Sequence, residues 1–176
     1  MGKLFVSTAI TLDGVMSVED WFVPDGGHDA AGRAILADAE AAVVGRKNFE
    51  GLAGYWTKET GDWAELINPM PKYVASRTLA EPLPWNGALL EGDAAAAVAR
   101  LKDELDGDLI TWGCGELTST LLAAGLVDEL LFWIHPALWG KGERPFREKV
   151  QVRLEAVGSE TFDSGVVLLR YAPASG

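Results

Sequence analysis

The sequence predicts an α/β fold of three layers, with a mostly parallel central sheet, helices on both faces and a C-terminal antiparallel hairpin. Short apolar segments rich in β-branched residues alternate with segments of helical periodicity along most of the 176 residues. Several apolar segments end at Gly or at small polar residues, as strands do before a turn. The last two segments mix apolar and polar residues with a partial period of two, which indicates antiparallel strands.

The first half of the chain begins with an apolar, β-branched segment at 4–10 that leads into the turn pair Asp13-Gly14. The segment 30–39 carries apolar residues at helical spacing, and Asp29 is its predicted N-cap. We expect strands at 4–10, 41–44 and 72–75, helices at 30–39 and 47–55, and loops at 21–28 and 57–71.

The second half repeats this alternation before the hairpin. Residues 94–105 are rich in Ala, Lys and Glu, which have high helix propensity. Gly125 follows another helical segment at the position where helices commonly end. We expect helices at 94–105 and 116–124, strands at 89–90, 108–112 and 130–134, and a hairpin formed by 150–157 and 165–171.

Composition limits the class of protein. A hydrophobic fraction of 48% and a charged fraction of 23% predict a globular chain, and residues 1–176 fit a single domain. The net charge of −11 argues against nucleic-acid and anionic-membrane partners, which need clustered cations. A single cysteine, no signal-peptide pattern and no long apolar run predict a cytoplasmic protein. His28, His135 and Cys114 show no metal-ligand spacing, so no metal site is expected.

Three strand ends are candidate phosphate-binding corners, because ligands of open α/β sheets bind beyond the carboxyl ends of strands. Each corner combines Gly or hydroxyl residues with a cation or a helix start, where free backbone N–H groups favour anions. A plain tight turn is the alternative at each one. The Gly turn at 113–117 lacks the third Gly of the dinucleotide fingerprint, since Thr118 stands there. The corners are Gly45, Arg46 and Lys47; Ser76, Arg77 and Thr78; and Gly113, Cys114, Gly115, Glu116 and Leu117.

Five segments in register resemble the C-terminal reductase family of the bacterial riboflavin-biosynthesis deaminase-reductases. The resemblance extends from about residue 3 to residue 171, although Asn48 stands where Thr is common. The segments are Thr8-Ala9-Ile10-Thr11-Leu12-Asp13-Gly14, Gly45-Arg46-Lys47-Asn48-Phe49-Glu50, Val74-Ala75-Ser76-Arg77-Thr78-Leu79, Gly113-Cys114-Gly115-Glu116-Leu117, and Leu126-Val127-Asp128-Glu129-Leu130 with His135-Pro136-Ala137-Leu138-Trp139-Gly140-Lys141-Gly142.

The resemblance implies a dihydrofolate-reductase-like fold, an NADPH cofactor and a homodimer. It implies that the 2′-phosphate lies near Ser76 and Arg77, and the pyrophosphate near the corners at 45–47 and 113–117. The implied activity is that of a reductase like 5-amino-6-(5-phosphoribosylamino)uracil reductase, with hydride transfer from NADPH to a small polar or heterocyclic substrate. No zinc deaminase signature is present, so the chain resembles the reductase part alone.

For the substrate side, we predict Asp13 as the catalytic carboxylate that orients the substrate or relays a proton, with a plain turn as the alternative. Loop position alone suggests Asp20, Trp21 and Trp56 as substrate-binding residues. One alternative function is dihydrofolate reduction, which the lack of an acid within 30–39 other than Asp38 disfavours. The other is a non-catalytic nucleotide-binding dimer.

Overall fold

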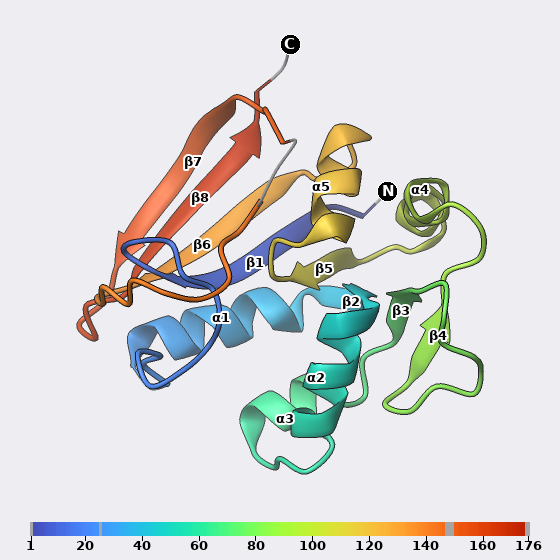
Figure 1. Cartoon of the computed structure of the whole chain (residues 1–176), viewed down its shortest axis with the longest axis horizontal. Helices are drawn as coiled ribbons and strands as arrows, with labels where there is room; N and C mark the ends of the chain where they lie inside the picture. The colour runs from blue at the N-terminus through green and yellow to red at the C-terminus, as the bar shows by residue number, and fades with distance from the viewer. Residues whose placement is uncertain (1, 25, 147–149, 175–176) are drawn as a thin grey trace.

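The computed structural model describes residues 2–24, 26–146 and 150–174. It contains an eight-stranded sheet of order β4-β3-β2-β5-β1-β6-β8-β7 (Figure 1). The strands from β4 to β6 pair in parallel, whereas β8 pairs antiparallel with both β6 and β7. The elements are β1 (Leu4–Thr11), α1 (Gly27–Ala37), β2 (Ala39–Gly45), α2 (Arg46–Trp56), α3 (Asp62–Ile67), β3 (Lys72–Ala75), β4 (Gly87–Leu89), α4 (Ala94–Glu104), β5 (Asp108–Trp112), α5 (Glu116–Ala123), β6 (Glu129–His135), β7 (Leu154–Thr161) and β8 (Val167–Pro173).

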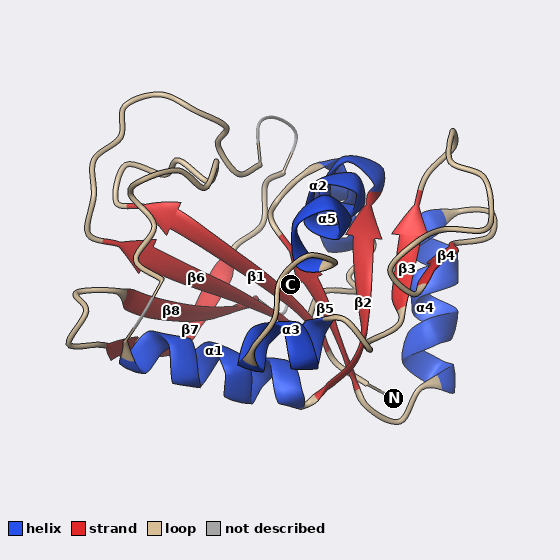
Figure 2. Ribbon diagram, turned by 90° about the horizontal axis from the view of Figure 1, so that it is seen from below, coloured by secondary structure: helices blue, strands red, loops and turns tan. Residues whose placement is uncertain are grey.

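Helices cover both faces of the sheet, so the predicted three-layer α/β fold is confirmed (Figure 2). Alternate residues of β2 show how the layers form, because successive side chains of a strand point to opposite faces. Ala41 and Val43 pack with α4 and α5, whereas Ala42 and Val44 pack with α1, α2 and α3. The strands of the parallel part are therefore buried on both sides and read as continuous apolar segments.

Three local expectations were wrong. Asp29 is not an N-cap: α1 begins at Gly27, and Asp29 lies in its first turn, where its carboxylate accepts a hydrogen bond from Trp63 Nε1. The loop expected at 57–71 contains α3, a helix too short for its periodicity to stand out. The strand expected at 150–157 instead covers Leu154–Thr161, and its pairing with β8 contains a bulge between Ala156 and Gly158.

The β7 edge is the most exposed part of the sheet. All eight residues of β7 are exposed, including the apolar side chains of Leu154 and Val157. Leu169 and Tyr171 of β8 are half-buried. Among the described residues, no helix has the length and apolar composition needed to cross a membrane.

Candidate functional site

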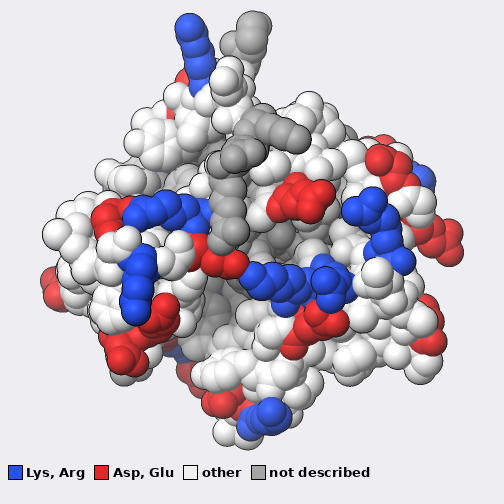
Figure 3. Space-filling view, in the orientation of Figure 1, with Lys and Arg blue, Asp and Glu red and all other residues white. Residues whose placement is uncertain are grey.

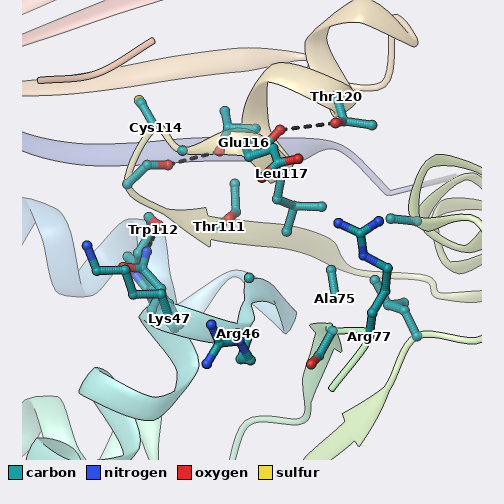
Figure 4. A pocket seen from close by; sticks show the side chains of 18 of the residues that line it. Arg46, Lys47, Ala75, Arg77, Thr111, Trp112, Cys114, Glu116, Leu117 and Thr120 are labelled. Carbon is teal, nitrogen blue, oxygen red and sulfur yellow. Dashed lines mark hydrogen bonds between the residues drawn. The ribbon is translucent and has the colours of Figure 1, made fainter. Parts of the chain in front are cut away.

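A single cavity of about 760 Å³ lies beyond the carboxyl ends of β3, β2 and β5. These strands are neighbours in the sheet and run parallel, so their ends meet at one edge. The three corners predicted from the sequence therefore surround one cavity, as expected. The lining includes all of their residues: Gly45, Arg46, Lys47, Ser76, Arg77, Thr78, Gly113, Cys114, Gly115, Glu116 and Leu117 (Figure 4).

Two helices begin at the cavity without a side-chain cap. The N-cap residue of α2 is Gly45 and that of α5 is Gly115, and neither can supply a side-chain acceptor. The first turn of a helix holds backbone N–H groups without helical partners and carries the positive end of the helix dipole. In contrast, Asp93 caps α4 by accepting a hydrogen bond from Ala96 N at 2.9 Å. The starts of α2 and α5 thus remain available to an anion.

Polar contacts between α2 and the glycine turn hold these two helix starts together. Asn48 Nδ2 donates to the carbonyl of Trp112 at 2.5 Å, and Thr118 Oγ1 donates to the carbonyl of Gly113 at 3.0 Å. A Cβ added to Gly113 would lie 3.0 Å from Asn48 Nδ2, and the φ of Gly113 is +80°. Gly113 therefore provides both the left-handed backbone conformation and the close approach that this turn needs.

The charged groups that line the cavity differ in their partners. Arg46 pairs with Glu50 at 3.1 Å, one helical turn along α2, and Lys47 pairs with Glu143 at 2.5 Å. Arg77, at the end of β3, forms no ion pair with the residues that the structure describes. Figure 4 shows its guanidinium extending toward the side of the cavity that α5 forms. Arg77 is therefore the lining cation best placed to bind an anionic ligand.

Ser76 Oγ accepts hydrogen bonds from the backbone N–H groups of Thr78 and Leu79, at 3.2 and 3.0 Å. These bonds fix the turn after β3 and leave the hydroxyl proton of Ser76 able to donate. The face of the molecule in Figure 3 carries interspersed basic and acidic side chains. Among the described residues, no group of His, Cys, Asp and Glu could hold a metal ion.

Cys114 lines the cavity but is not a reactive thiol. The residue is buried, and its Sγ lies 3.0 Å from Thr8 Oγ1. Burial raises the pKa of the Cys114 thiol to about 11, which outweighs the opposite effect of the hydrogen bond with Thr8. The thiolate form is therefore rare at neutral pH.

The four residues predicted for catalysis and substrate binding lie outside the lining of the cavity. The Asp13 carboxylate accepts hydrogen bonds from Thr11 Oγ1 at 2.6 Å and from the backbone N–H groups of Trp139 and Gly140 at 3.0 and 2.7 Å. These bonds, with that of Thr11 the strongest influence, lower the pKa of Asp13 to about 2. Through these bonds Asp13 connects the end of β1 to the segment that follows β6, which is a structural role. The catalytic role of Asp13 stays a prediction.

The other three also have local roles. Trp21 is buried, and its Nε1 donates to the carbonyl of Ser17 at 2.8 Å. Trp56 is a half-buried residue at the end of α2 that packs against the cluster formed by α2 and α3, and Asp20 is exposed. Their substrate-binding roles stay predictions. Several lining residues were not selected from the sequence, although Asn48 and Met16 lie within or next to the segments that resemble the family. The lining residues not selected include Met16, Asn48, Asp93, Thr111, Trp112 and Glu143.

Comparison with known proteins agrees with this arrangement. The model of the RibD C-terminal domain matches residues 2–168. The chain is 30% identical to the uncharacterized protein YyaP of Bacillus subtilis over 179 aligned positions, covering 96% of this chain and 94% of YyaP.

Solved structures share the fold. A protein assigned to riboflavin biosynthesis from Shewanella sp. PV-4 superposes with a TM-score of 0.79 at 20% identity, covering 98% of this chain and 99% of that one. The deaminase/5-amino-6-(5-phosphoribosylamino)uracil reductase of Thermotoga maritima gives a TM-score of 0.69 at 16% identity. That match covers 98% of this chain but 57% of the Thermotoga protein. With the family model matched over nearly its whole length, this chain belongs to the RibD C-terminal domain family.

Proposed function

We propose that this protein is an NADPH-dependent reductase that acts on a small polar or heterocyclic substrate. The observation that carries the proposal is the convergence on one cavity of two uncapped helix starts and of Arg77, which forms no ion pair with the described residues. Backbone N–H groups at helix starts bind phosphate without needing positive side chains. Two helix starts can bind a diphosphate, and Arg77 can bind a separate third phosphate. Binding through backbone N–H groups is also compatible with a chain of net charge −11.

The cavity residues fit NADPH in three parts. The backbone N–H groups of the first turns of α2 and α5 would hold the pyrophosphate, with Arg46 beside them. Arg77 and the hydroxyl of Ser76 would hold the 2′-phosphate at the end of β3. Because β1 follows β5 in the sheet, the nicotinamide would lie toward β1, near Met16. When bound there, NADPH supplies the hydride, and the protein provides alignment and excludes water.

Dihydrofolate reduction is a weaker candidate. Helix α1 spans Gly27–Ala37, and Asp38 follows it as the exposed C-cap residue rather than as a buried acid. Asp29, in the first turn of α1, is engaged by Trp63 Nε1 and pairs with Arg33 at 3.2 Å. Neither carboxylate is placed to hold a pterin ring in a buried pocket. The non-catalytic dimer remains the alternative that the experiments below separate from an enzyme.

We further propose that the protein is a homodimer that associates through β7 and β8. The support is the exposure of all of β7, together with the half-buried Leu169 and Tyr171 on the neighbouring strand. Apolar surface at a sheet edge favours association because burial removes it from water. A cytoplasmic location is part of the proposal as well, and the lone thiol of Cys114 fits a reducing compartment.

The direct test is a fluorescence titration with NADPH and NADH, because Trp112 lines the cavity and can report binding. The unmodified chain should bind NADPH more tightly than NADH. Arg77→Ala should weaken NADPH binding about 10- to 100-fold, the loss expected for a charge-assisted phosphate contact, and should leave NADH binding nearly unchanged. Arg100→Ala, an exposed change on α4 outside this cavity, is the matched control.

Equal affinity for the two dinucleotides would contradict a 2′-phosphate site, and no binding of either would refute the reductase assignment. Loss of the absorbance of reduced nicotinamide would then identify the substrate from a set of compounds. The set should include 5-amino-6-(5-phosphoribosylamino)uracil, oxidised pterins and small ketones. Tight NADPH binding without turnover of any of them would favour the non-catalytic dimer.

A further inference from the structure

The ion pair between Lys47 and Glu143 joins two walls of the cavity. Lys47 is the second residue of α2, and Glu143 lies in the segment 140–146 that follows β6. Lys47 Nζ and Glu143 Oε1 are 2.5 Å apart, and both residues line the cavity. The pair therefore brings together a cation and a carboxylate from elements that are 96 residues apart in the sequence.

Backbone hydrogen bonds hold Glu143 in place. Its N–H donates to Ser17 Oγ at 2.8 Å, and its carbonyl accepts from Met16 N at 2.8 Å. Three residues along, the N–H of Phe146 donates to the carbonyl of Cys114 at 3.1 Å. The segment is thus fixed to the loop after β1 and to the glycine turn. The Glu143 carboxylate has a defined position from which it can orient the ammonium of Lys47.

The position of this pair along the cavity follows from the sheet order, and the inference rests on the proposed function. A 2′-phosphate at β3 and a pyrophosphate at β2 and β5 leave the β1 side for the nicotinamide and the substrate. Met16, which follows β1, is bound to Glu143 through its backbone. Lys47 and Glu143 therefore lie at the end of the cavity where the reaction would occur.

Reduction of a C=X double bond, with X oxygen or nitrogen, needs a proton as well as a hydride. Among the described residues of the lining, the carboxylates, the ammonium and the thiol are those of Asp93, Glu116, Glu143, Lys47 and Cys114. Lys47 and Glu143 form the ion pair that lies beside Met16. Cys114 is buried against Thr8, and its thiol has a pKa raised to about 11. The side chain of Lys47 is 79% exposed, so a ligand in the cavity can reach its ammonium.

We propose that Lys47 is the proton donor of the reduction and that Glu143 is its positioning residue. The carbon of the C=X bond gains the hydride with its electron pair, and the nicotinamide is oxidised. The π electron pair moves to X, which forms a bond to a proton from Lys47 Nζ. The N–H bond of the ammonium breaks, leaving a neutral amine that regains a proton from water. Glu143 holds the re-formed ammonium in place through their ion pair.

The position of the pair can be tested by binding alone, because the nicotinamide ring is neutral in NADPH and positive in NADP⁺. Lys47→Met leaves the Glu143 carboxylate without this partner and should lower the ratio of Kd for NADP⁺ to Kd for NADPH about fivefold. Glu143→Gln leaves the ammonium and should raise the same ratio about fivefold. Lys58→Met, an equal change of charge beyond α2 and outside the cavity lining, should leave the ratio unchanged.

Opposite shifts in the two variants place the pair beside the nicotinamide. Shifts in the same direction, or no shift beyond that of Lys58→Met, overturn the inference while NADPH binding still supports the proposed function. A chain that binds neither dinucleotide instead refutes the proposed function. Protein melting temperatures of the variants confirm that each one is folded.

The proton transfer is tested on a reducible substrate. Lys47→Met should lower kcat about 100-fold or more, a larger change than that in Kd for NADPH, since general acids contribute on this scale. Added methylammonium should restore part of the lost kcat in Lys47→Met, but not in Arg77→Ala. A raised Kd with an unchanged kcat would show that Lys47 merely binds phosphate, and a slow variant that methylammonium does not rescue would refute proton donation.

Discussion

The two histidines of the chain hold the same residue of the loop between β1 and α1, and this arrangement predicts acid-sensitive stability. The N–H of Val23 donates to His135 Nδ1 at 3.1 Å, and its carbonyl lies 2.9 Å from His28 Nε2. Because Nδ1 of His135 accepts a hydrogen bond, this ring is neutral in the folded protein. His135 is 1% exposed, and the two imidazole rings lie 5.8 Å apart.

Burial, assisted by the nearby His28, lowers the pKa of His135 from 6.5 to about 4. The unfolded chain takes up a proton below pH 6.5, whereas the folded chain does so below about pH 4. The stability is therefore complete above pH 6.5 and is lost as the pH falls toward 4. A pKa difference of this size corresponds to a loss of about 2 kcal/mol at pH 5 and about 3 kcal/mol at pH 4.

The assay is urea unfolding at several pH values between 7.5 and 4, followed by tryptophan fluorescence and compared with His135→Asn. The Asn side chain keeps an oxygen acceptor near the position of Nδ1 but does not titrate. The free energy of unfolding of the variant should thus vary less over this range, by about 3 kcal/mol. If both proteins lose the same stability between pH 6.5 and 4, the neutral buried state of His135 is not the cause and the reasoning fails.

Three further changes test the cavity and the sheet edge. Gly113→Ala should lower the free energy of unfolding by about 1–2 kcal/mol and weaken NADPH binding, because the φ of Gly113 is +80° and the new Cβ would press on Asn48. Gly115→Ala is the control: its φ is −97°, and no atom lies within 4 Å of the added Cβ. Thermal unfolding should show a smaller effect for Gly115→Ala than for Gly113→Ala. Asp93→Asn keeps the cap of α4 but removes a carboxylate from the cavity, so Kd for NADPH should fall about twofold. Asp103→Asn, outside the cavity lining, is the control and should leave this Kd unchanged in the same titration. Leu154→Lys combined with Val157→Lys should convert the proposed dimer to a monomer in light scattering, whereas an unchanged mass would exclude β7 from the interface.

The sequence predicted the parallel core of the fold well, because burial on both faces leaves a clear pattern. The strands at 72–75 and 108–112 were expected with their observed bounds. The β7 strand was misplaced because all of its residues are exposed, so no buried face marks its register. Helix α3 was missed although Trp63, Leu66 and Ile67 have helical spacing, since six residues are too few to distinguish a helix from a loop.

The three corners that line the cavity could be predicted because each one is a local feature: a strand end followed by Gly or hydroxyl residues, with a helix start at two of them. Their phosphate-binding role stays a prediction. The contacts of the residues selected for the substrate side could not be predicted, because they join segments that are distant in the sequence. Nothing near Asp13 in the sequence shows that its carboxylate binds the N–H groups of Trp139 and Gly140. Similarly, no local pattern joins Lys47 to Glu143. Polar residues in loops are selected from sequence by their chemistry, whereas their partners are set by the fold.

The way this cavity is built explains how a strongly acidic chain could bind a ligand with three phosphate groups. Side-chain cations would compete with the surplus of carboxylates, and two of the three lining cations are indeed paired with acids. Backbone N–H groups at the starts of α2 and α5 have no side-chain cap, since Gly45 and Gly115 offer no side-chain acceptor, although Glu116 lies in the first turn of α5. Arg77 is the lining cation that forms no ion pair with the described residues, so specificity for a third phosphate would depend on it. Its removal should therefore weaken NADPH binding and leave NADH binding nearly unchanged.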